Sequence, residues 1–366
     1  MRVIFAGGGT GGHINPAISV ADYAKSKDEN FEALFIGTKK GLETKLVPNA
    51  GYDIEYIDVQ GFNRSKLLSN VKTVYKLFES VSKCKKIIKS FKPDCIVCTG
   101  GYVSGPVTMA AHKMKVPSLI HEQNVYPGLT VKGSQKYVDY LALSFEETVN
   151  EMTEKSKCVV TGNPIREEIL KADKEECRKK LGINKPFVLI FGGSLGAAKI
   201  NETVIGMLDK IIKDGKIRLV FGTGDRNYNS VMEKLKEKNI TLNDDVSVVS
   251  YIDNMAEMMA AADLVVSRSG AITVSEIAAM AKPSILIPSP NVVRNHQEQN
   301  AREFERNGAA AVIVEKELSS NVLYEKIMSL AGNEEEMHKM SDNLKKLAKT
   351  DALQKIYELM QKMADK

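Results

Sequence analysis

Short apolar runs recur along the chain and alternate with longer stretches of helical or loop character. In the first part of the chain these runs are Arg2–Ala6, Ala33–Ile36, Ile54–Ile57, Cys95–Cys98, Ser118–Ile120, Tyr140–Leu143 and Cys158–Val160. Such runs are typical of strands buried on both faces, and their alternation with helices is typical of a parallel sheet covered by helices. We therefore predict an α/β domain in this part of the chain.

The pattern breaks at Gly162 and Pro164, continues through a polar helical stretch, Lys174–Leu181, and then begins again. The second series of strands is Phe187–Phe191, Arg218–Phe221, Val246–Val249, Leu264–Val266, Ser284–Ile287 and Ala311–Val314. Each series opens with a strand, a glycine-rich loop and a helix, as nucleotide-binding domains do. The fold predicted from this repeat is α/β, with two doubly wound Rossmann-like domains facing a cleft.

The break in the pattern also sets the expected domain boundaries. We place the first domain at residues 1–163 and the second at residues 164–345. In the last segment, residues 346–366, apolar side chains at helical spacing within Ala352–Met363 predict an amphipathic helix. This helix is a candidate to pack back on the first domain.

The loop after the first strand, Gly7–His13, matches the dinucleotide-binding pattern G-x-G-x-x-G, and Asn15-Pro16 predicts the start of the next helix. That fingerprint needs an acidic residue about 20 positions on, at the end of the second strand. The second strand here ends in Lys39 and Lys40, which would suit a 2′-phosphate. An NADP-dependent oxidoreductase is therefore one hypothesis. His13 is either a general base or a residue that orients the loop.

The stretch Ser267–Glu276 links an apolar strand to a helix that we expect to begin within Ile277–Met280. A helix start presents unpaired N–H groups and the positive end of a dipole, so it favours an anion such as a phosphate. Glu276, beside this helix start, would then hold the ribose hydroxyls of a nucleotide. The alternative is a capping box, in which Thr273 caps the helix and Glu276 reaches back to the Thr273 N–H.

Two polar clusters follow predicted strands, at the strand ends where open α/β sheets bind ligands. The first is His121-Glu-Gln-Asn124, and the second is Asn295-His-Gln-Glu-Gln-Asn300, whose amides suit sugar hydroxyls. A metal site is not expected, because neighbouring residues of a strand, such as His121 and Glu122, point to opposite faces.

Composition narrows the class of protein. A chain of 366 residues is long enough for two domains, and its five scattered cysteines do not suggest a disulfide framework. Cys95 and Cys98 lie within an apolar strand, so we interpret them as buried apolar residues. No apolar run approaches the roughly 20 residues of a membrane span, and Met1-Arg2 leads straight into a strand, so we expect a cytoplasmic protein.

The net charge of +5 is concentrated in Phe62–Lys92, which holds nine lysines and arginines against one acid, Glu79, a local charge of 9 − 1 = +8. A basic segment of this kind predicts a surface for phosphates, either nucleic acid or an anionic membrane. The apolar residues of the segment that fall at helical spacing among the lysines are Leu67, Val71, Val74, Tyr75 and Phe78. The alternative is an ordinary core-facing helix with a solvated basic side.

Taken together, the motifs resemble one family, the MurG family of bacterial peptidoglycan N-acetylglucosaminyltransferases, which has the GT-B fold and belongs to glycosyltransferase family 28. The matching stretches are Gly8–His13, Gly100–Pro106, His121–Asn124, Gly162–Arg166, Gly192–Ser194, Ser267–Glu276 and Asn295–Gln297. They span both predicted domains in the order of the family, which makes the resemblance far more specific than one glycine loop.

The resemblance implies an inverting hexosyltransferase that moves N-acetylglucosamine from UDP-N-acetylglucosamine to the C4 hydroxyl of the muramoyl sugar of lipid I, which is undecaprenyl-diphospho-muramoylpentapeptide. The product is lipid II, used in peptidoglycan synthesis. The family also implies a peripheral protein at the cytoplasmic face of the cell membrane, with Phe62–Lys92 against anionic lipid and a cell-wall synthesis complex as a candidate partner. It implies no cofactor, no metal and no nucleic acid.

Residue roles follow from the same resemblance. The implied substrate-binding residues are Thr10, Gly11, Gly12, Asn124, Arg166, Ser194, Ile252, Ala271, Ile272, Thr273, Val274, Ser275, Glu276 and Gln297. Of these, the helix start at Ala271 lies under the diphosphate, Glu276 holds the ribose, and Gln297 addresses the sugar. His13 is the first candidate for the catalytic base and Glu122 the second. The chain departs from some family members at His296 and Leu195, where they have glutamine.

Four alternatives to this function remain. A glycosyltransferase with another lipid acceptor, such as diacylglycerol, or a UDP-sugar epimerase would share the donor motifs, whereas Gly100–Pro106 and His121–Asn124 favour the muramoyl acceptor. An NADP-dependent oxidoreductase rests only on the first glycine loop and the lysines after the second strand. A non-enzymatic binding module is disfavoured by the two polar clusters.

Overall fold

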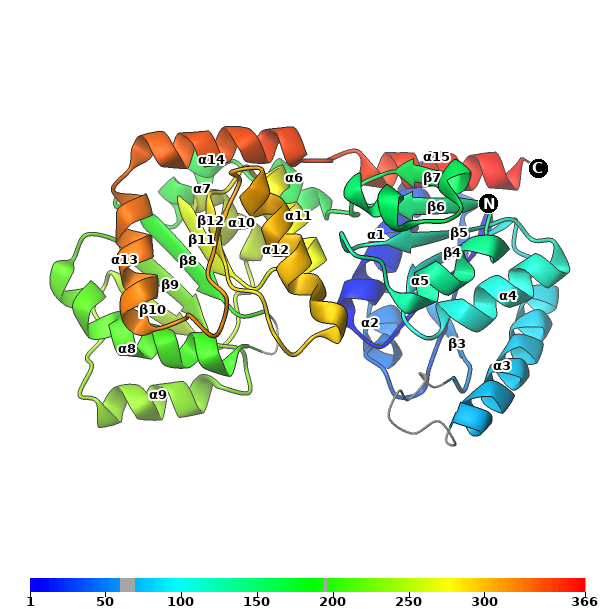
Figure 1. The fold of residues 1–366 in the computed structure, drawn as a ribbon, viewed down its shortest axis with the longest axis horizontal. Coiled ribbons are helices and arrows are strands. Elements are labelled where there is room, and N and C mark those ends of the chain that lie inside the picture. The colour runs from blue at the N-terminus through cyan, green and yellow to red at the C-terminus, as the bar shows by residue number, and fades with distance from the viewer. Residues whose placement is uncertain (60–69, 194–195, 366) are drawn as a thin grey trace. The chain divides into compact units, whose positions relative to one another are not determined.

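The computed structural model describes residues 1–59, 70–193 and 196–365 (Figure 1). It divides into two compact units, Met1–Ile165 with Lys349–Lys366, and Arg166–Ala348. Ser194, Leu195 and the residues 62–69 of the predicted basic segment lie outside the described residues. No helix in the described part of the chain combines the length and the apolar character that crossing a membrane requires.

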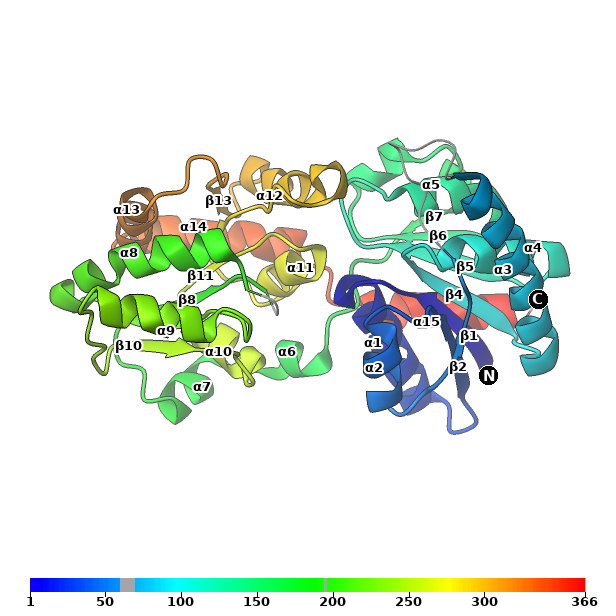
Figure 2. The same ribbon diagram turned by 90° about the horizontal axis from the view of Figure 1, so that it is seen from below.

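The described residues of the first unit form a seven-stranded parallel sheet with the order β3-β2-β1-β4-β5-β6-β7. Its strands are β1 (Arg2–Gly7), β2 (Glu32–Gly37), β3 (Asp53–Tyr56), β4 (Cys95–Gly100), β5 (Ser118–Glu122), β6 (Tyr140–Leu143) and β7 (Cys158–Val160). The main helices are α1 (Gly11–Lys27), α2 (Glu43–Asn49), α3 (Asn70–Phe91), α4 (Ser104–Met114), α5 (Leu129–Ser134) and α15 (Ala352–Ala364). Figure 2 shows helices on both faces of the sheet.

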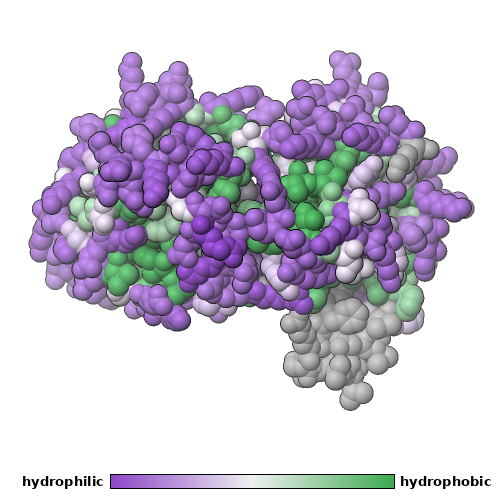
Figure 3. All heavy atoms as spheres, turned by 45° about the horizontal axis from the view of Figure 1, so that its top comes forward, coloured by the Kyte–Doolittle hydropathy of each residue, from purple (hydrophilic) through white to green (hydrophobic). Residues whose placement is uncertain are grey.

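Successive side chains of β1 point to opposite faces of the sheet, so they belong to two separate parts of the core of this unit. Val3 and Phe5 pack with residues of α1 and α15, whereas Ile4 and Ala6 pack with residues of α3 and α4. The final helix α15 therefore belongs to the first unit. In Figure 3 hydrophilic side chains cover most of the visible surface, with groups of apolar side chains between them.

The described residues of the second unit form a six-stranded parallel sheet with the order β10-β9-β8-β11-β12-β13. Its strands are β8 (Phe187–Phe191), β9 (Arg218–Gly222), β10 (Val246–Val249), β11 (Leu264–Ser267), β12 (Ser284–Leu286) and β13 (Ala311–Val312). Its helices are α6 (Glu167–Lys171), α7 (Lys174–Lys180), α8 (Ala198–Asp214), α9 (Tyr228–Glu237), α10 (Met255–Ala261), α11 (Ala271–Ala279), α12 (His296–Arg306), α13 (Ser320–Ala331) and α14 (Glu334–Leu347). Each strand predicted from an apolar run is present in one of the two sheets.

Two predicted helix starts are wrong. Helix α1 begins at Gly11 rather than at Asn15-Pro16, because the Thr10 carbonyl already accepts hydrogen bonds from the N–H groups of His13 (3.1 Å) and Ile14 (3.2 Å). Pro16 lies inside the helix, where it costs one helical N–H.

Helix α11 begins at Ala271, with Gly270 as its N-cap. This is the start that the family resemblance implied, and it lies ahead of the start within residues 277–280 that the apolar pattern predicted. The Val274 N–H donates to the Gly270 carbonyl at 3.0 Å, so the turn that contains Thr273 is already helical. A capping box that starts at Thr273 is therefore excluded, and Glu276 lies in the second turn.

Candidate active site

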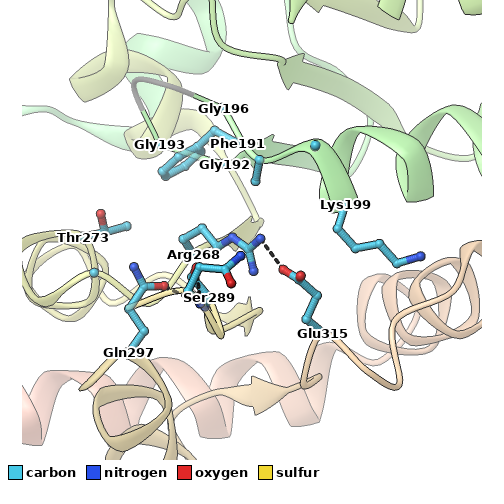
Figure 4. A pocket seen from close by; sticks show the side chains of 14 residues that line it. Phe191, Gly192, Gly193, Gly196, Lys199, Arg268, Thr273, Ser289, Gln297 and Glu315 are labelled. Atoms are coloured by element: carbon cyan, nitrogen blue, oxygen red, sulfur yellow. Dashed lines mark hydrogen bonds and ion pairs between the residues drawn. The ribbon is translucent and has the colours of Figure 1, made fainter. Parts of the chain in front are cut away.

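The second unit contains a cavity of about 520 Å³ at the carboxyl edge of its sheet. Its walls come from the loop after β8, the turn between β11 and α11, the segment after β12, and the start of α12 (Figure 4). The lining residues that carry polar side chains are Lys199, Arg268, Thr273, Ser289, Asn291, Gln297 and Glu315. Parallel strands end at one edge of the sheet, so residues far apart in sequence meet there.

Arg268 lines the cavity but is held by the protein itself. Its guanidinium donates to the carbonyls of Ile287 (3.2 Å) and Pro288 (3.1 Å) and forms an ion pair with Glu315, drawn as a dashed line in Figure 4. Arg268 lies within the stretch 267–276 that the sequence linked to phosphate binding, but the sequence did not reveal these partners. Its main effect is to fasten the segment after β12 beside the start of α11.

Gln297 is fixed at the cavity wall by two hydrogen bonds. Its side-chain Oε1 accepts from the Ser289 N–H at 2.9 Å, and its backbone carbonyl accepts from the Ser269 hydroxyl at 2.8 Å. In Figure 4 the amide nitrogen of Gln297 lies on the side of Thr273. The arrangement therefore points a donor toward the first turn of α11.

Glu276 lies one turn beyond Thr273 on α11 and is only 8% exposed. Its Oε1 is 3.5 Å from Nη2 of Arg166. The other guanidinium nitrogen of Arg166, Nη1, forms an ion pair with Glu168 at 2.7 Å. Burial raises the pKa of Glu276, and the nearby Arg166 opposes that shift. The carboxyl and the guanidinium thus stand together next to the helix start.

The other donor-side residues implied by the family differ in what they can offer. The Val274 side chain is fully buried, so only its backbone is available, and Ala271 is 8% exposed. Ile252 is buried against Gly222, where an added Cβ would come 2.8 Å from the Ile252 side chain. Ile252 does not line the cavity formed by the described residues.

In the first unit, His13 lies in the first turn of α1 and is half-buried. Its Nδ1 is 3.2 Å from the Gly8 carbonyl and 3.4 Å from Oγ1 of Thr10. The Thr99 hydroxyl donates to the His13 carbonyl at 2.7 Å. Gly100 adopts φ +106° beside the ring, where an added Cβ would come 2.8 Å from Cδ2 of His13. The ring is therefore held at the end of β4.

Glu43, at the start of α2, is a functional candidate that the sequence reasoning missed. Its side chain is fully buried, and it accepts hydrogen bonds from the Gly9 N–H (3.0 Å), the Thr38 N–H (2.9 Å) and the Thr38 hydroxyl (2.8 Å). Burial alone would raise the pKa of Glu43, but the N–H groups of Gly9 and Thr38 hold it below its ordinary value. A single acid two residues after Gly41 gave little signal, because acidic side chains usually face solvent.

This carboxylate also bears on the oxidoreductase hypothesis. In a dinucleotide-binding domain the glycine-loop N–H groups face the pyrophosphate. Here the Gly9 N–H already donates a hydrogen bond to the carboxylate of Glu43. The first glycine loop therefore does not offer the donor set that the dinucleotide fingerprint requires.

The cluster His121–Asn124 at the end of β5 is largely engaged within the protein. His121 Nε2 is 2.9 Å from the Gly162 carbonyl, and Gln123 Nε2 lies 3.0 Å from His121 Nδ1. The two oxygens of Glu122 accept from the Asn124 N–H at 2.9 Å and the Gly128 N–H at 2.7 Å. Burial raises the pKa of Glu122 and the two N–H groups oppose that shift. Glu122 is thus a support for the Asn124 loop.

Cys95 and Cys98 are fully buried free thiols, as predicted. Burial raises the pKa of Cys95 to about 12. Within the described ranges, no group of three or more histidine, cysteine, aspartate or glutamate side chains could hold a metal ion.

Comparison with known proteins defines the class of protein. Residues 3–143 match the description Glycosyltransferase family 28 N-terminal domain, and residues 187–356 match Glycosyltransferase family 28 C-terminal domain. A relative from Caldanaerobacter subterraneus subsp. tengcongensis, named UDP-N-acetylglucosamine--N-acetylmuramyl-(pentapeptide) pyrophosphoryl-undecaprenol N-acetylglucosamine transferase, is 49% identical over 98% of this chain and 99% of its own.

Two solved structures extend the comparison. The crystal structure of Acinetobacter baumannii MurG matches with a TM-score of 0.78 and 25% identity over 99% of each chain. UDP-GlcNAc 2-epimerase from Neisseria meningitidis matches with a TM-score of 0.67 and 15% identity over 99% of this chain and 100% of the epimerase, which shows a shared fold alone. The chain belongs to glycosyltransferase family 28, and the predicted fold of two Rossmann-like domains is confirmed.

Proposed function

We infer that this chain is the inverting glycosyltransferase that moves N-acetylglucosamine from UDP-N-acetylglucosamine to the C4 hydroxyl of the muramoyl sugar of lipid I, forming lipid II. The observation that carries the inference is the full-length similarity, at 49% identity, to a relative named for this transfer. Epimerases share the fold, but at 15% identity for the Neisseria meningitidis enzyme they do not share the sequence.

The donor is proposed to bind in the cavity of the second unit. The first turn of α11 directs N–H groups and a partial positive charge toward it, which suits the diphosphate. Glu276 would accept from the ribose hydroxyls, and the amide of Gln297 would donate to the sugar. Arg166 beside Glu276 would add positive charge near the phosphates.

His13 is proposed as the catalytic base. A carbonyl can only accept, so Nδ1 carries the proton when it bonds the Gly8 carbonyl, and Nε2 keeps a lone pair. Nε2 would take the proton of the C4 hydroxyl as that oxygen forms its bond to the anomeric carbon. The bond from the anomeric carbon to the UDP oxygen breaks on the opposite side, which inverts the linkage. The start of α11 would stabilise the charge on departing UDP.

Glu122, the second candidate base, is disfavoured by the contacts of its carboxylate. Each oxygen already accepts a backbone N–H, from Asn124 and from Gly128. Taking a proton would weaken these bonds and loosen the loop that presents Asn124.

The chain is further proposed to rest on anionic lipid through α3. Tyr75 and Phe78 of this helix are 72% and 59% exposed, whereas Val81 and Cys84 are buried against the sheet. Exposed lysines follow on the same helix, among them Lys83. Exposed aromatic rings beside lysines are typical of a surface that lies on anionic membranes.

Sedimentation with vesicles tests this membrane contact. The double substitution Tyr75→Ser, Phe78→Ser should reduce binding to phosphatidylglycerol vesicles by about tenfold or more, given roughly 1.5–3 kcal/mol for burying one large apolar side chain. Glu79→Gln on the same helix is the matched control. Equal binding of the double variant and the control would contradict the proposal.

Ligand-induced thermal shift tests the donor assignment. UDP-N-acetylglucosamine at 100 times its dissociation constant should stabilise the chain by about 2.7 kcal/mol, and NADPH should give no shift. A shift with NADPH alone would favour the oxidoreductase hypothesis.

A further inference from the structure

We propose that Glu43 is a positioning residue for the catalytic base, acting on His13 through the peptide group between Gly8 and Gly9. The inference rests on the proposed function, because it takes His13 as the base. In this role Glu43 orients His13 and does not itself take part in the chemical step.

The geometry depends on the two ends of one peptide group. The N–H of the Gly8–Gly9 peptide belongs to Gly9 and donates to Oε2 of Glu43 at 3.0 Å. Its carbonyl belongs to Gly8 and lies 3.2 Å from Nδ1 of His13. A peptide group is planar, so the bond to Glu43 fixes the direction of the carbonyl that receives the imidazole N–H.

Electrostatics act in the same direction as geometry. A hydrogen bond from the peptide N–H to a carboxylate polarises the peptide and makes its carbonyl a stronger acceptor. A stronger acceptor holds the proton of His13 on Nδ1. Nε2 is then kept as the unprotonated nitrogen, which is the nitrogen that a base needs.

The carboxylate is itself held rigidly. Oε1 accepts from both the N–H and the hydroxyl of Thr38, and the side chain is fully buried. Three glycines make room for it: an added Cβ would come 2.7 Å from Oε1 at Gly8, 1.9 Å from Oε2 at Gly41 and 2.6 Å from Cγ at Gly37. A carboxylate packed this closely has one position, and so does the peptide bonded to it.

The chemistry of the partners makes the carboxylate hard to replace. The Gly9 N–H, the Thr38 N–H and the Thr38 hydroxyl all donate to it. In Glu43→Gln one oxygen becomes an NH₂ group, which would face a donor such as the Gly9 N–H. The peptide would turn away from that contact and take the Gly8 carbonyl with it.

The test combines kinetics with a matched control. Glu43→Gln should lower kcat for transfer to a lipid I analogue by about 10- to 100-fold, part of the 10²–10⁴ that a general base supplies. The KM for UDP-N-acetylglucosamine should stay unchanged. Thr38→Val removes one hydrogen bond from the same carboxylate and leaves the Gly9 N–H bond, so its kcat should fall less than about threefold. Equal losses in both variants would overturn the proposal.

A double-mutant cycle separates this role from general support of the fold. If Glu43 acts through His13, adding Glu43→Gln to His13→Ala should cause no further loss of the residual rate. A full additional loss in the His13→Ala background would overturn the proposal.

The ring of His13 can also be observed without any turnover. In protein labelled with ¹⁵N-histidine, the His13 signals, assigned by their absence in His13→Ala, should show the Nδ1–H tautomer in the wild type and a mixture in Glu43→Gln. An Nε2–H tautomer in the wild type would overturn the proposal even if Glu43→Gln fails to fold. A wild type without transfer activity but with the Nδ1–H tautomer would refute the proposed function alone.

Discussion

His121 should make the stability of the first unit depend on pH. Its side chain is 1% exposed, and burial lowers its pKa from 6.5 to about 4, against the opposing effect of the hydrogen bond to the Gly162 carbonyl. Gln123 adds a second reason. Its Nε2 donates to the Thr99 carbonyl at 2.8 Å and lies 3.0 Å from His121 Nδ1, so a proton on Nδ1 would face an NH₂ group.

The magnitude follows from the two pKa values. Between about pH 6.5 and pH 4 the unfolded chain binds a proton at His121 and the folded chain does not, so lowering the pH favours unfolding. The contribution is complete above about pH 6.5 and decreases as the pH falls toward 4. From about pH 7.5 to about pH 5 the folded chain should lose about 2 kcal/mol through this residue.

The assay is urea unfolding followed by circular dichroism at about pH 7.5 and about pH 5, on the wild type and on His121→Gln. Glutamine retains an N–H donor for the Gly162 carbonyl but does not titrate. Other titrating groups, such as Glu43, are present in both proteins and cancel in the difference. The wild type should lose about 2 kcal/mol more than the variant on acidification. The same pH dependence of the unfolding free energy in both proteins would show that His121 does not carry this effect.

Three further outcomes are expected. Glu276→Gln should raise the KM for UDP-N-acetylglucosamine by about 10- to 100-fold in steady-state kinetics, because a hydrogen bond to a charged group is worth about 1.5–3 kcal/mol, and an unchanged KM would exclude the ribose contact. Gly101→Ala should lower the midpoint of thermal unfolding by several degrees relative to Gly133→Ala. Gly101 has φ +76°, and an added Cβ would come 2.4 Å from the Gly8 carbonyl oxygen, whereas at Gly133 an added Cβ would meet no atom within 4 Å. Equal midpoints of the two variants would contradict this prediction. EDTA should leave the transfer rate unchanged, since the start of α11 is proposed to supply the positive charge, and loss of activity restored by Mg²⁺ would contradict that role.

Most of the fold could be predicted because buried parallel strands leave a local signature. Runs such as Phe187–Phe191 are apolar at every position, and the strands appear where those runs occur. Helix starts were less predictable. The N-cap of α11, Gly270, gives no capping signal of the serine or aspartate type, and the N-cap of α1, Thr10, makes no side-chain capping hydrogen bond. Both helices begin ahead of the residues that the local pattern indicated as their starts.

Only those residues of the candidate site that lie in recognisable sequence motifs could be predicted. The sequence indicated His13 and Glu276 because their neighbours form recognisable loops. Glu43 and the pair of Arg268 with Glu315 could not be found in this way, because their partners lie far away in the chain or in backbone groups that any residue carries. The hydrogen bonds that Glu122 accepts from backbone N–H groups could likewise not be inferred from the sequence.

The most direct test of the function is transfer of labelled N-acetylglucosamine from UDP-N-acetylglucosamine to a short-chain lipid I analogue. Parallel reactions would contain diacylglycerol or no acceptor, with His13→Ala and Glu276→Ala beside the wild type. We expect a β-linked product with the lipid I analogue alone, and a strongly reduced yield of it in both variants. Label on diacylglycerol, release of an epimerised sugar without acceptor, or binding of UDP without transfer would contradict it.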